Sequence, residues 1–242
     1  MLKENEKLDD LHRNGYMLIQ NRKMFCFGLD AVLLSDFAKA KKGETVLDLC
    51  CGKGIIPILM EAKTDCTQFV GLEIQPEVVD MAMRSVVYNN LQKEIYIEQG
   101  DLKEVDSMYD LHTFDVVTCN PPYIKVDSGA VNTMDSKAAA RHEIYCTLED
   151  VMIAASKMLK YGGRFYMVHY VNRLVDIIEL SRKHKLEPKQ MRFLHSMYDK
   201  APAMVLMEFV KEGKPHLEVM PPLIVYAAKG VYTKEVNDIF YN

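Results

Sequence analysis

Residues 45–57 read TVLDLCCGKGIIP, and this stretch decides the fold. An apolar run over Thr45–Cys50 precedes a short turn, and a second apolar run over Ile55–Ala62 follows it. Gly52 and Gly54 allow the turn to be tight and let a ligand approach the backbone, because neither has a Cβ. A buried strand that passes through glycines into a helix is typical of the start of a βαβ unit.

The same alternation continues along the chain. Further strands are expected at 68–74, 95–98, 114–119, 164–170, 190–195 and 204–211, with helices at 76–90, 148–159 and 171–185. Strands that alternate with helices of this length predict an α/β fold, a seven-stranded and mostly parallel sheet with helices on both faces. No convincing helix separates the last two strands, so we expect one antiparallel edge strand.

Upstream of this pattern, residues 16–27 read YMLIQNRKMFCF and predict two short strands around a polar turn at 21–23. Apolar residues at helical spacing follow over 29–38, with Asp30 placed to cap the start of that helix. We therefore expect residues 1–44 to form a hairpin-and-helix extension, and residues 45–242 to form one domain.

Composition narrows the class of protein. The chain has 242 residues, of which 49% are hydrophobic and 26% charged, the balance of a globular protein with its own core. The longest strongly apolar stretch, 54–60, is far shorter than the roughly 20 residues of a membrane span. The charged N-terminus has no apolar segment typical of secretion. These features predict a cytoplasmic protein that makes no membrane contact.

The six cysteines show no C-x-x-C pair and no histidine partners at metal-ligand spacing, so we expect no metal site and reduced thiols at Cys26, Cys50, Cys51, Cys66, Cys119 and Cys146. The net charge is −4, yet residues 151–200 carry ten Lys or Arg against four Asp or Glu. Such a segment is compatible with a phosphate-binding patch and equally with a solvated helical face.

Carboxylates stand near the carboxyl ends of the first three expected strands of the domain. Asp48 lies near the end of the first, before the turn, Glu73 lies at the end of the second 25 residues later, and Asp101 follows the third. The end of the second strand is where doubly wound folds hold a ribose diol. Asp48 would repel a pyrophosphate but attract an ammonium group, and Pro57 fills the third small position of a dinucleotide-binding motif. The pattern favours S-adenosylmethionine over NAD, and an ordinary turn with an exposed Glu is the alternative.

The run D-x-C-x-G-x-G over 48–54 resembles motif I of the class I S-adenosylmethionine-dependent methyltransferases, whose fold is Rossmann-like. This chain departs from the motif at Cys50, which stands where the family has its first glycine, and we expect slightly tighter packing there. The resemblance implies a set of cofactor-binding residues: Asp30, Asp48, Cys50, Gly52, Gly54, Glu73, Ile74, Asp101, Leu102 and Asn120. Two of these residues have an alternative to cofactor binding. Asp30 could simply cap a helix, and Asp101 could simply stabilise a turn.

Residues 114–123 read FDVVTCNPPY. Two successive prolines cannot continue a central strand, so Asn120 is held at its carboxyl end, where ligands bind in this architecture. The tetrapeptide resembles motif IV of methyltransferases that alkylate a planar nitrogen of adenine, guanine or glutamine. The resemblance implies that Asn120 Oδ1 and the Pro121 carbonyl accept the two N–H bonds of the amine, that Pro122 stiffens the turn, and that Tyr123 stacks on the substrate.

Three further segments identify a closer family. Residues 19–20 with 25–38, 140–144 and 230–235 resemble the Gram-positive branch of the bacterial tRNA (valine) adenine-37 N6-methyltransferases. This resemblance implies a tRNA substrate, N6-methylation of the adenosine 3′ of the anticodon, and a flipped base. Two alternatives stay open: N5-methylation of glutamine in a protein such as a release factor, and N-methylation of adenine or guanine in rRNA. The glutamine enzymes place a helical domain before motif I, and only about 45 residues precede it here.

Candidate substrate contacts are spread over two regions. Tyr123 ends motif IV. Arg141 and His142, with Glu143, lie beyond the polar loop that follows it, and a capping or salt-bridge role is the alternative for these three. The cationic segment offers Arg182, Lys183 and Lys185, with Lys189 and Arg192, for contacts to phosphates.

Overall fold

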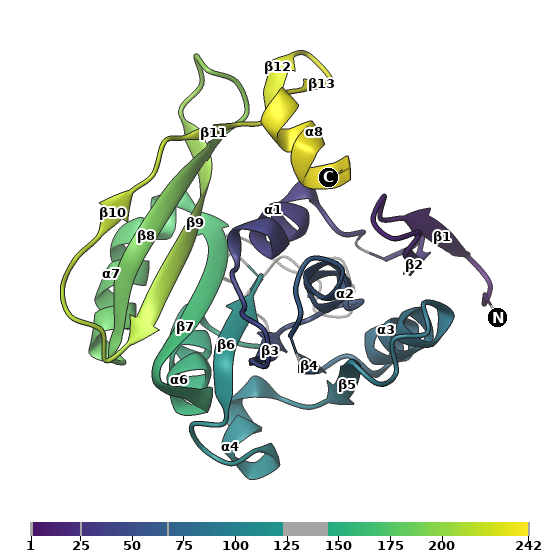
Figure 1. The fold of residues 1–242 in the computed structure, drawn as a ribbon, viewed down its shortest axis with the longest axis horizontal. Coiled ribbons are helices and arrows are strands. Elements are labelled where there is room, and N and C mark those ends of the chain that lie inside the picture. Colours follow the sequence, from purple (N-terminus) through teal and green to yellow (C-terminus); the bar gives the residue numbers. More distant parts are fainter. Residues whose placement is uncertain (1, 25, 67, 123–144, 242) are drawn as a thin grey trace, which may run out of the picture.

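The computed structural model describes residues 2–24, 26–66, 68–122 and 145–241, and a mixed sheet runs through its centre (Figure 1). The seven long strands are β3 (Thr45–Leu49), β4 (Gln68–Glu73), β5 (Ile95–Gln99), β6 (Phe114–Cys119), β7 (Leu159–Tyr170), β8 (Leu186–His195) and β9 (Pro202–Lys211). Their order is β8-β9-β7-β6-β3-β4-β5, and the short β10 (Glu218–Val219) and β11 (Leu223–Ile224) pair with β8. The predicted α/β architecture is confirmed.

One detail of the predicted sheet is wrong. The antiparallel strand is β9, and it lies between β7 and β8, whereas we expected it at the edge. A short loop joins β8 to β9, so the two strands form a hairpin, and β9 occupies the inner place. Val205, Leu206 and Met207 are buried in succession, as in a strand covered on both faces.

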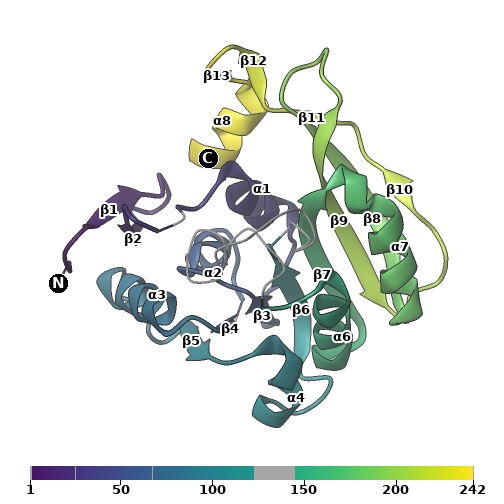
Figure 2. The same ribbon diagram turned by 180° about the vertical axis from the view of Figure 1, so that it is seen from behind.

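Helices cover both faces of the sheet (Figures 1 and 2). The core on one face includes residues of α1 (Leu29–Phe37), α2 (Ile55–Glu61), α3 (Pro76–Tyr88) and α8 (Lys234–Tyr241). The core on the other includes residues of η1 (Leu102–Glu104), α4 (Val105–Met108), α6 (Leu148–Met158) and α7 (Leu174–Lys183), and η2 (Val171–Arg173) precedes α7. No helix in these described ranges is long and apolar enough to cross a membrane. The boundary predicted at residue 44 stays a prediction.

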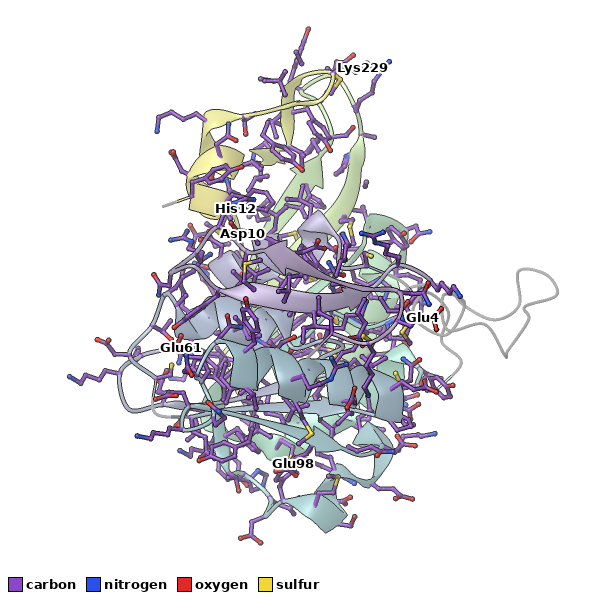
Figure 3. The ribbon with its side chains drawn as sticks, turned by 90° about the vertical axis from the view of Figure 1, so that its right-hand side faces the viewer. Glu4, Asp10, His12, Glu61, Glu98 and Lys229 are labelled. Carbon is purple, nitrogen blue, oxygen red and sulfur yellow. The ribbon has the colours of Figure 1, made fainter. Side chains whose placement is uncertain are left out.

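The N-terminal hairpin differs from the one expected. Strand β2 (Met17–Asn21) pairs with β1 (Glu6–Asp10). The described residues between the turn at 21–23 and α1, which are 24 and 26–28, form no strand. The sequence of β1, EKLDD, contains a single apolar residue, so periodicity could not reveal it. In Figure 3, Asp10 and His12 lie beside α8, and the rings of His12 and Tyr241 are 5.0 Å apart. A second small hairpin, β12 (Tyr226–Ala228) with β13 (Val231–Tyr232), precedes α8.

Side chains of α3 hold the hairpin in place. The buried Ser85 hydroxyl accepts the Ile19 N–H at 3.0 Å, and Asn89 bonds both the N–H and the C=O of Met17. Arg84 binds both carboxylate oxygens of Glu6, at 2.8 and 2.6 Å. These contacts fix β2 and the segment that follows it, which forms one wall of the site described below.

The substitution Ser85→Ala tests this anchoring. It removes the acceptor of a buried N–H, a change that costs about 1–3 kcal/mol. We expect the Ile19 amide to exchange hydrogen faster while amides of β6 keep their protection. Equal protection of Ile19 in both proteins would contradict the account.

A buried carboxyl links two strands of the sheet. Asp48 on β3 lies directly opposite Thr118 on β6, and the Thr118 hydroxyl donates to its Oδ1 at 2.6 Å. Asp48 is 1% exposed, and no hydrogen-bond partner reaches its Oδ2 from the described residues. Burial raises the pKa of Asp48 to about 8, with a further contribution from the charge of Glu73 against the lowering effect of Thr118.

The pH dependence of stability checks this state of Asp48. Between about pH 4 and pH 8 the unfolded carboxyl ionises while the folded one keeps its proton. The unfolded chain then binds fewer protons, so stability falls as pH rises. Asp48→Asn removes this contribution. The free energy of unfolding of the variant, relative to that of the wild type, should therefore increase by about 1–4 kcal/mol from pH 5 to pH 8. Urea unfolding at both pH values measures the difference, and a constant difference would show that Asp48 is ionised.

Candidate active site

A cavity of about 160 Å³ opens at the carboxyl ends of β3, β4, β5 and β6. Several elements that are distant in sequence form its walls. They are the segment after β2 with the start of α1, the β3–α2 turn, the ends of β4 and β5 with the first turn of α3, the residues after β6, and Tyr145 with Cys146 before α6. This is the edge at which ligands bind in doubly wound folds.

The turn between β3 and α2 has three residues in the left-handed region. Gly52 and Gly54 have φ of 55° and 81°, and Cys50 has φ of 57°. The backbone at residue 50 thus has the conformation that favours glycine, and a non-glycine residue there costs on the order of 1 kcal/mol. A Cβ added to Gly52 would meet no protein atom within 4 Å, so this glycine borders open space in the cavity wall.

Glu73 ties the two neighbouring turns together. Its Oε2 accepts the Gly52 N–H at 3.0 Å, and its Oε1 accepts the Gln75 N–H at 3.0 Å. The side chain is 6% exposed and lines the cavity. A carboxylate offers about four acceptor positions, so it can hold both backbone amides and still accept a ligand hydroxyl.

Three further residues of the expected cofactor-binding set lie beyond the ends of β4 and β5. Asp101 and Leu102 line the cavity, as does Ile74 after β4. Asp101 also caps η1, because its Oδ1 accepts the Lys103 N–H at 2.9 Å. Its turn role and its place on the cavity wall are therefore both present.

Three cysteine thiols contribute to the wall of the cavity. Cys50, Cys51 and Cys146 line it, and the Sγ atoms of Cys50 and Cys146 are 4.0 Å apart. Hydrogen bonding with Cys119 raises the pKa of Cys50 well above its usual value, and burial does the same for Cys51. A protonated thiol is a poor nucleophile, so these groups form a neutral wall and do not compete for an electrophile. In the described residues, no cluster of three or more His, Cys, Asp or Glu is placed to hold a metal ion.

Asn120 directly follows β6 and lines the cavity, and so does Pro122. The Asn120 Nδ2 donates to Oδ2 of Asp30 at 3.1 Å. Asp30 was expected to cap α1 or to approach the cofactor, but the N-cap is Gly28 and Asp30 lies in the first turn of the helix. The helix-cap expectation is therefore wrong. A strand end and a helix start 90 residues apart meet at this edge of the cavity.

Two features of the cavity wall fit S-adenosylmethionine, and a third group expected to bind it lies outside the wall. Gly52 leaves open space where the backbone approaches the cavity. Glu73 presents a carboxylate at the position expected for a ribose diol. Asp48 has a buried oxygen without a partner in the described residues, next to the turn, although neither Asp48 nor Gly54 lines the cavity.

None of the expected substrate contacts among the described residues lines the cavity. Tyr123, Arg141, His142 and Glu143 lie outside the described residues. The cationic side chains of α7 and the start of β8 are paired with carboxylates: Arg182 with Glu187, Lys183 with Glu149, Lys185 with Glu212. Because β8 is parallel to β7, Lys183 and Lys185 lie at the edge of the sheet opposite the cavity. Their contact with phosphates stays a prediction.

Sequence reasoning missed part of the cavity wall. Met24, Phe27 and Gly28 come from the segment after β2, and Gln75 and Val78 from the start of α3. The glycine-rich turn and the asparagine carry local signals, whereas Met24, Phe27 and Gly28 belong to a segment that docks on α3 through contacts distant in sequence.

Comparison with known proteins agrees with this geometry. A family model described as a methyltransferase domain matches residues 40–220. A tRNA1(Val) (adenine(37)-N6)-methyltransferase of Porphyromonas gingivalis is 25% identical over 217 residues, covering 86% of this chain and 84% of that protein. The protein of the same name from Haemophilus influenzae is 23% identical and covers 92% and 94%.

Solved structures share the fold. A predicted O-methyltransferase from Agrobacterium tumefaciens superposes with a TM-score of 0.70 at 19% identity, over 87% of this chain and 94% of that one. A tRNA m1G37 methyltransferase from M. jannaschii gives 0.59 at 15% identity, over 87% and 58%. The family match covers most of the chain. It confirms the expected methyltransferase activity, with S-adenosylmethionine as the methyl donor. The chain belongs to the methyltransferase domain family and is an S-adenosylmethionine-dependent methyltransferase.

Proposed function

We propose that this protein methylates N6 of an adenosine in tRNA, at position 37 beside the anticodon. The observation that carries the proposal is the position of Asn120-Pro121-Pro122 immediately after β6, with Asn120 and Pro122 on the wall of the cavity. The names of the relatives from Porphyromonas gingivalis and Haemophilus influenzae support tRNA as the substrate.

The residues after β6 suit an exocyclic amine. The lone pair of such an amine is delocalised into the ring, which makes the nitrogen a weak nucleophile. Asn120 Oδ1 and the Pro121 carbonyl each accept one N–H bond, which favours a tetrahedral nitrogen whose lone pair is withdrawn from the ring π system and directed toward the methyl donor. Two prolines in succession keep both acceptors in a stiff turn. Catalysis then depends mainly on placement.

The methyl donor supplies a methyl group on a sulfonium, and its departure leaves a neutral thioether. The leaving group needs no general acid for this reason, and the amine loses one proton to water after it gains the methyl group. Protonated thiols at Cys50 and Cys51 suit this chemistry. An adenine stacked in a helix cannot reach Asn120, so we infer that the base is flipped out of a single-stranded loop.

The direct test is methylation of tRNA by the full-length protein. Labelled S-adenosylmethionine is incubated with total tRNA from a strain that lacks this gene, and the nucleosides are identified by mass spectrometry. N6-methyladenosine in tRNA is the expected product. Label in rRNA or in a glutamine of a release factor, with tRNA unlabelled, would replace the proposed substrate with one of the two alternatives.

The substitution Asn120→Ala removes one of the two acceptors. We expect turnover to fall at least about 100-fold, while the dissociation constant of S-adenosylmethionine, measured by calorimetry, changes less than about threefold. Equal losses in binding and turnover would contradict the role assigned to Asn120.

Glu73 should show the converse behaviour. Glu73→Ala releases the amides of Gly52 and Gln75 and removes the acceptor for a ligand hydroxyl. We expect binding of S-adenosylmethionine to weaken about 10- to 100-fold, with a smaller loss for Glu73→Gln, which keeps one acceptor oxygen. Unchanged binding by the Ala variant would remove Glu73 from the cofactor site.

A further inference from the structure

We propose that Asp30 is a positioning residue that turns the oxygen end of the Asn120 carboxamide, and not its NH2 end, toward the substrate. Residue 28 is glycine because a larger side chain would displace the Asp30 carboxylate. The inference rests on the proposed function of Asn120 as the acceptor for the amine. It assigns to Asp30 an effect on turnover and not on cofactor binding.

The contact between the two side chains favours one orientation of Asn120. Oδ2 of Asp30 lies 3.1 Å from Nδ2 of Asn120. An ionised carboxylate can only accept hydrogen bonds, so it selects the NH2 end of the carboxamide. The oxygen of the planar group is then turned away from Asp30. A bond with a charged acceptor is roughly twice as strong as a neutral one, so this orientation is held firmly.

Gly28 is an independent observation at the same place. A Cβ at residue 28 would overlap Oδ1 of Asp30 and lie 3.3 Å from its Cγ. The backbone there is extended, with φ of −101° and ψ of 174°, a conformation open to any residue. Glycine at residue 28 therefore leaves room for the Asp30 carboxylate, which any larger residue would displace.

The start of α1 is also fixed from the side of the hairpin. Gln20 on β2 is 1% exposed, and its Oε1 accepts the Phe27 N–H at 3.1 Å. Its Nε2 donates to Asp9 on β1. A buried amide thus holds the residue next to Gly28, so the carboxylate of Asp30 faces Asn120 from an anchored segment.

Loss of the carboxylate has a specific consequence. Without it, the Asn120 carboxamide loses the charged acceptor that favours its present orientation, and the orientation with the NH2 group toward the substrate amine becomes more populated. Two donors would then face each other, and the amine would lose the acceptor that orients its lone pair. The cofactor pocket around Glu73 does not depend on this contact.

Kinetics of Asp30→Ala and Asp30→Asn with tRNA test the proposal. We expect kcat to fall about 10- to 100-fold for Ala and less for Asn, which keeps one acceptor oxygen. KM for tRNA and the dissociation constant of S-adenosylmethionine should stay within about threefold. Asp36→Asn is the matched control, because Asp36 lies on the same helix and pairs with Lys63, and it should behave as wild type. Weaker cofactor binding with unchanged kcat would instead make Asp30 a cofactor ligand.

Gly28→Ala provides a second route to the same change. The added Cβ displaces a short flexible side chain, so the fold should persist while the contact is lost. Turnover should drop as in Asp30→Ala, and adding Gly28→Ala to Asp30→Ala should cause no further loss. Additive losses would show that Gly28 acts by another means.

An NMR measurement that needs no tRNA tests the contact between Asp30 and Asn120 independently of the proposed function. In ¹⁵N-labelled protein, the side-chain NH2 signal of Asn120, assigned by its absence in Asn120→Ala, should shift in Asp30→Ala and Gly28→Ala but not in Asp36→Asn. An unmoved signal would overturn the positioning role. A shifted signal in a protein that leaves tRNA unmethylated would keep the contact and reject only the proposed substrate.

Discussion

The parallel pairing of β3 with β6 is the constraint on which the site depends. Its register sets Asp48 opposite Thr118 and Leu49 opposite Cys119, so the turn that begins at Cys50 emerges beside Asn120. The hydroxyl of Thr118 bonds the Asp48 carboxyl across this pair. A shift of one residue would reverse the face of every side chain on the strand and separate the cofactor turn from the asparagine. Methyl donor and acceptor can meet because this one register brings their loops together.

The N-terminal segments contribute a further set of contacts that position the site. Ser85 and Asn89 on α3 hold β2, Gln20 on β2 holds Phe27, and Asp30 at the start of α1 reaches Asn120. The hairpin therefore contributes to the same cavity as the glycine-rich turn. Its signals in sequence are weak because its docking on α3 depends on polar contacts and on a small apolar cluster of Ile19 with Val78 and Met81, which join distant segments.

Sequence reasoning reached the features that local chemistry determines. The strand–turn–helix around Gly52 and the stiff turn after Asn120 depend on neighbouring residues, and both lie where they were expected. It failed where distant segments decide. The inner place of β9 follows from a hairpin with β8, and strand β1 exists through its pairing with β2. Asp30 looked like a helix cap because its partner is 90 residues away.

A crystal structure with S-adenosylhomocysteine and an anticodon stem-loop of the substrate tRNA would test the central claim most directly. The account predicts the adenine flipped out of the loop, its amine about 3 Å from Asn120 Oδ1 and from the Pro121 carbonyl, and the Asn120 Nδ2 still on Asp30. An adenine that binds at this edge of the sheet with its amine away from Asn120 would contradict the account.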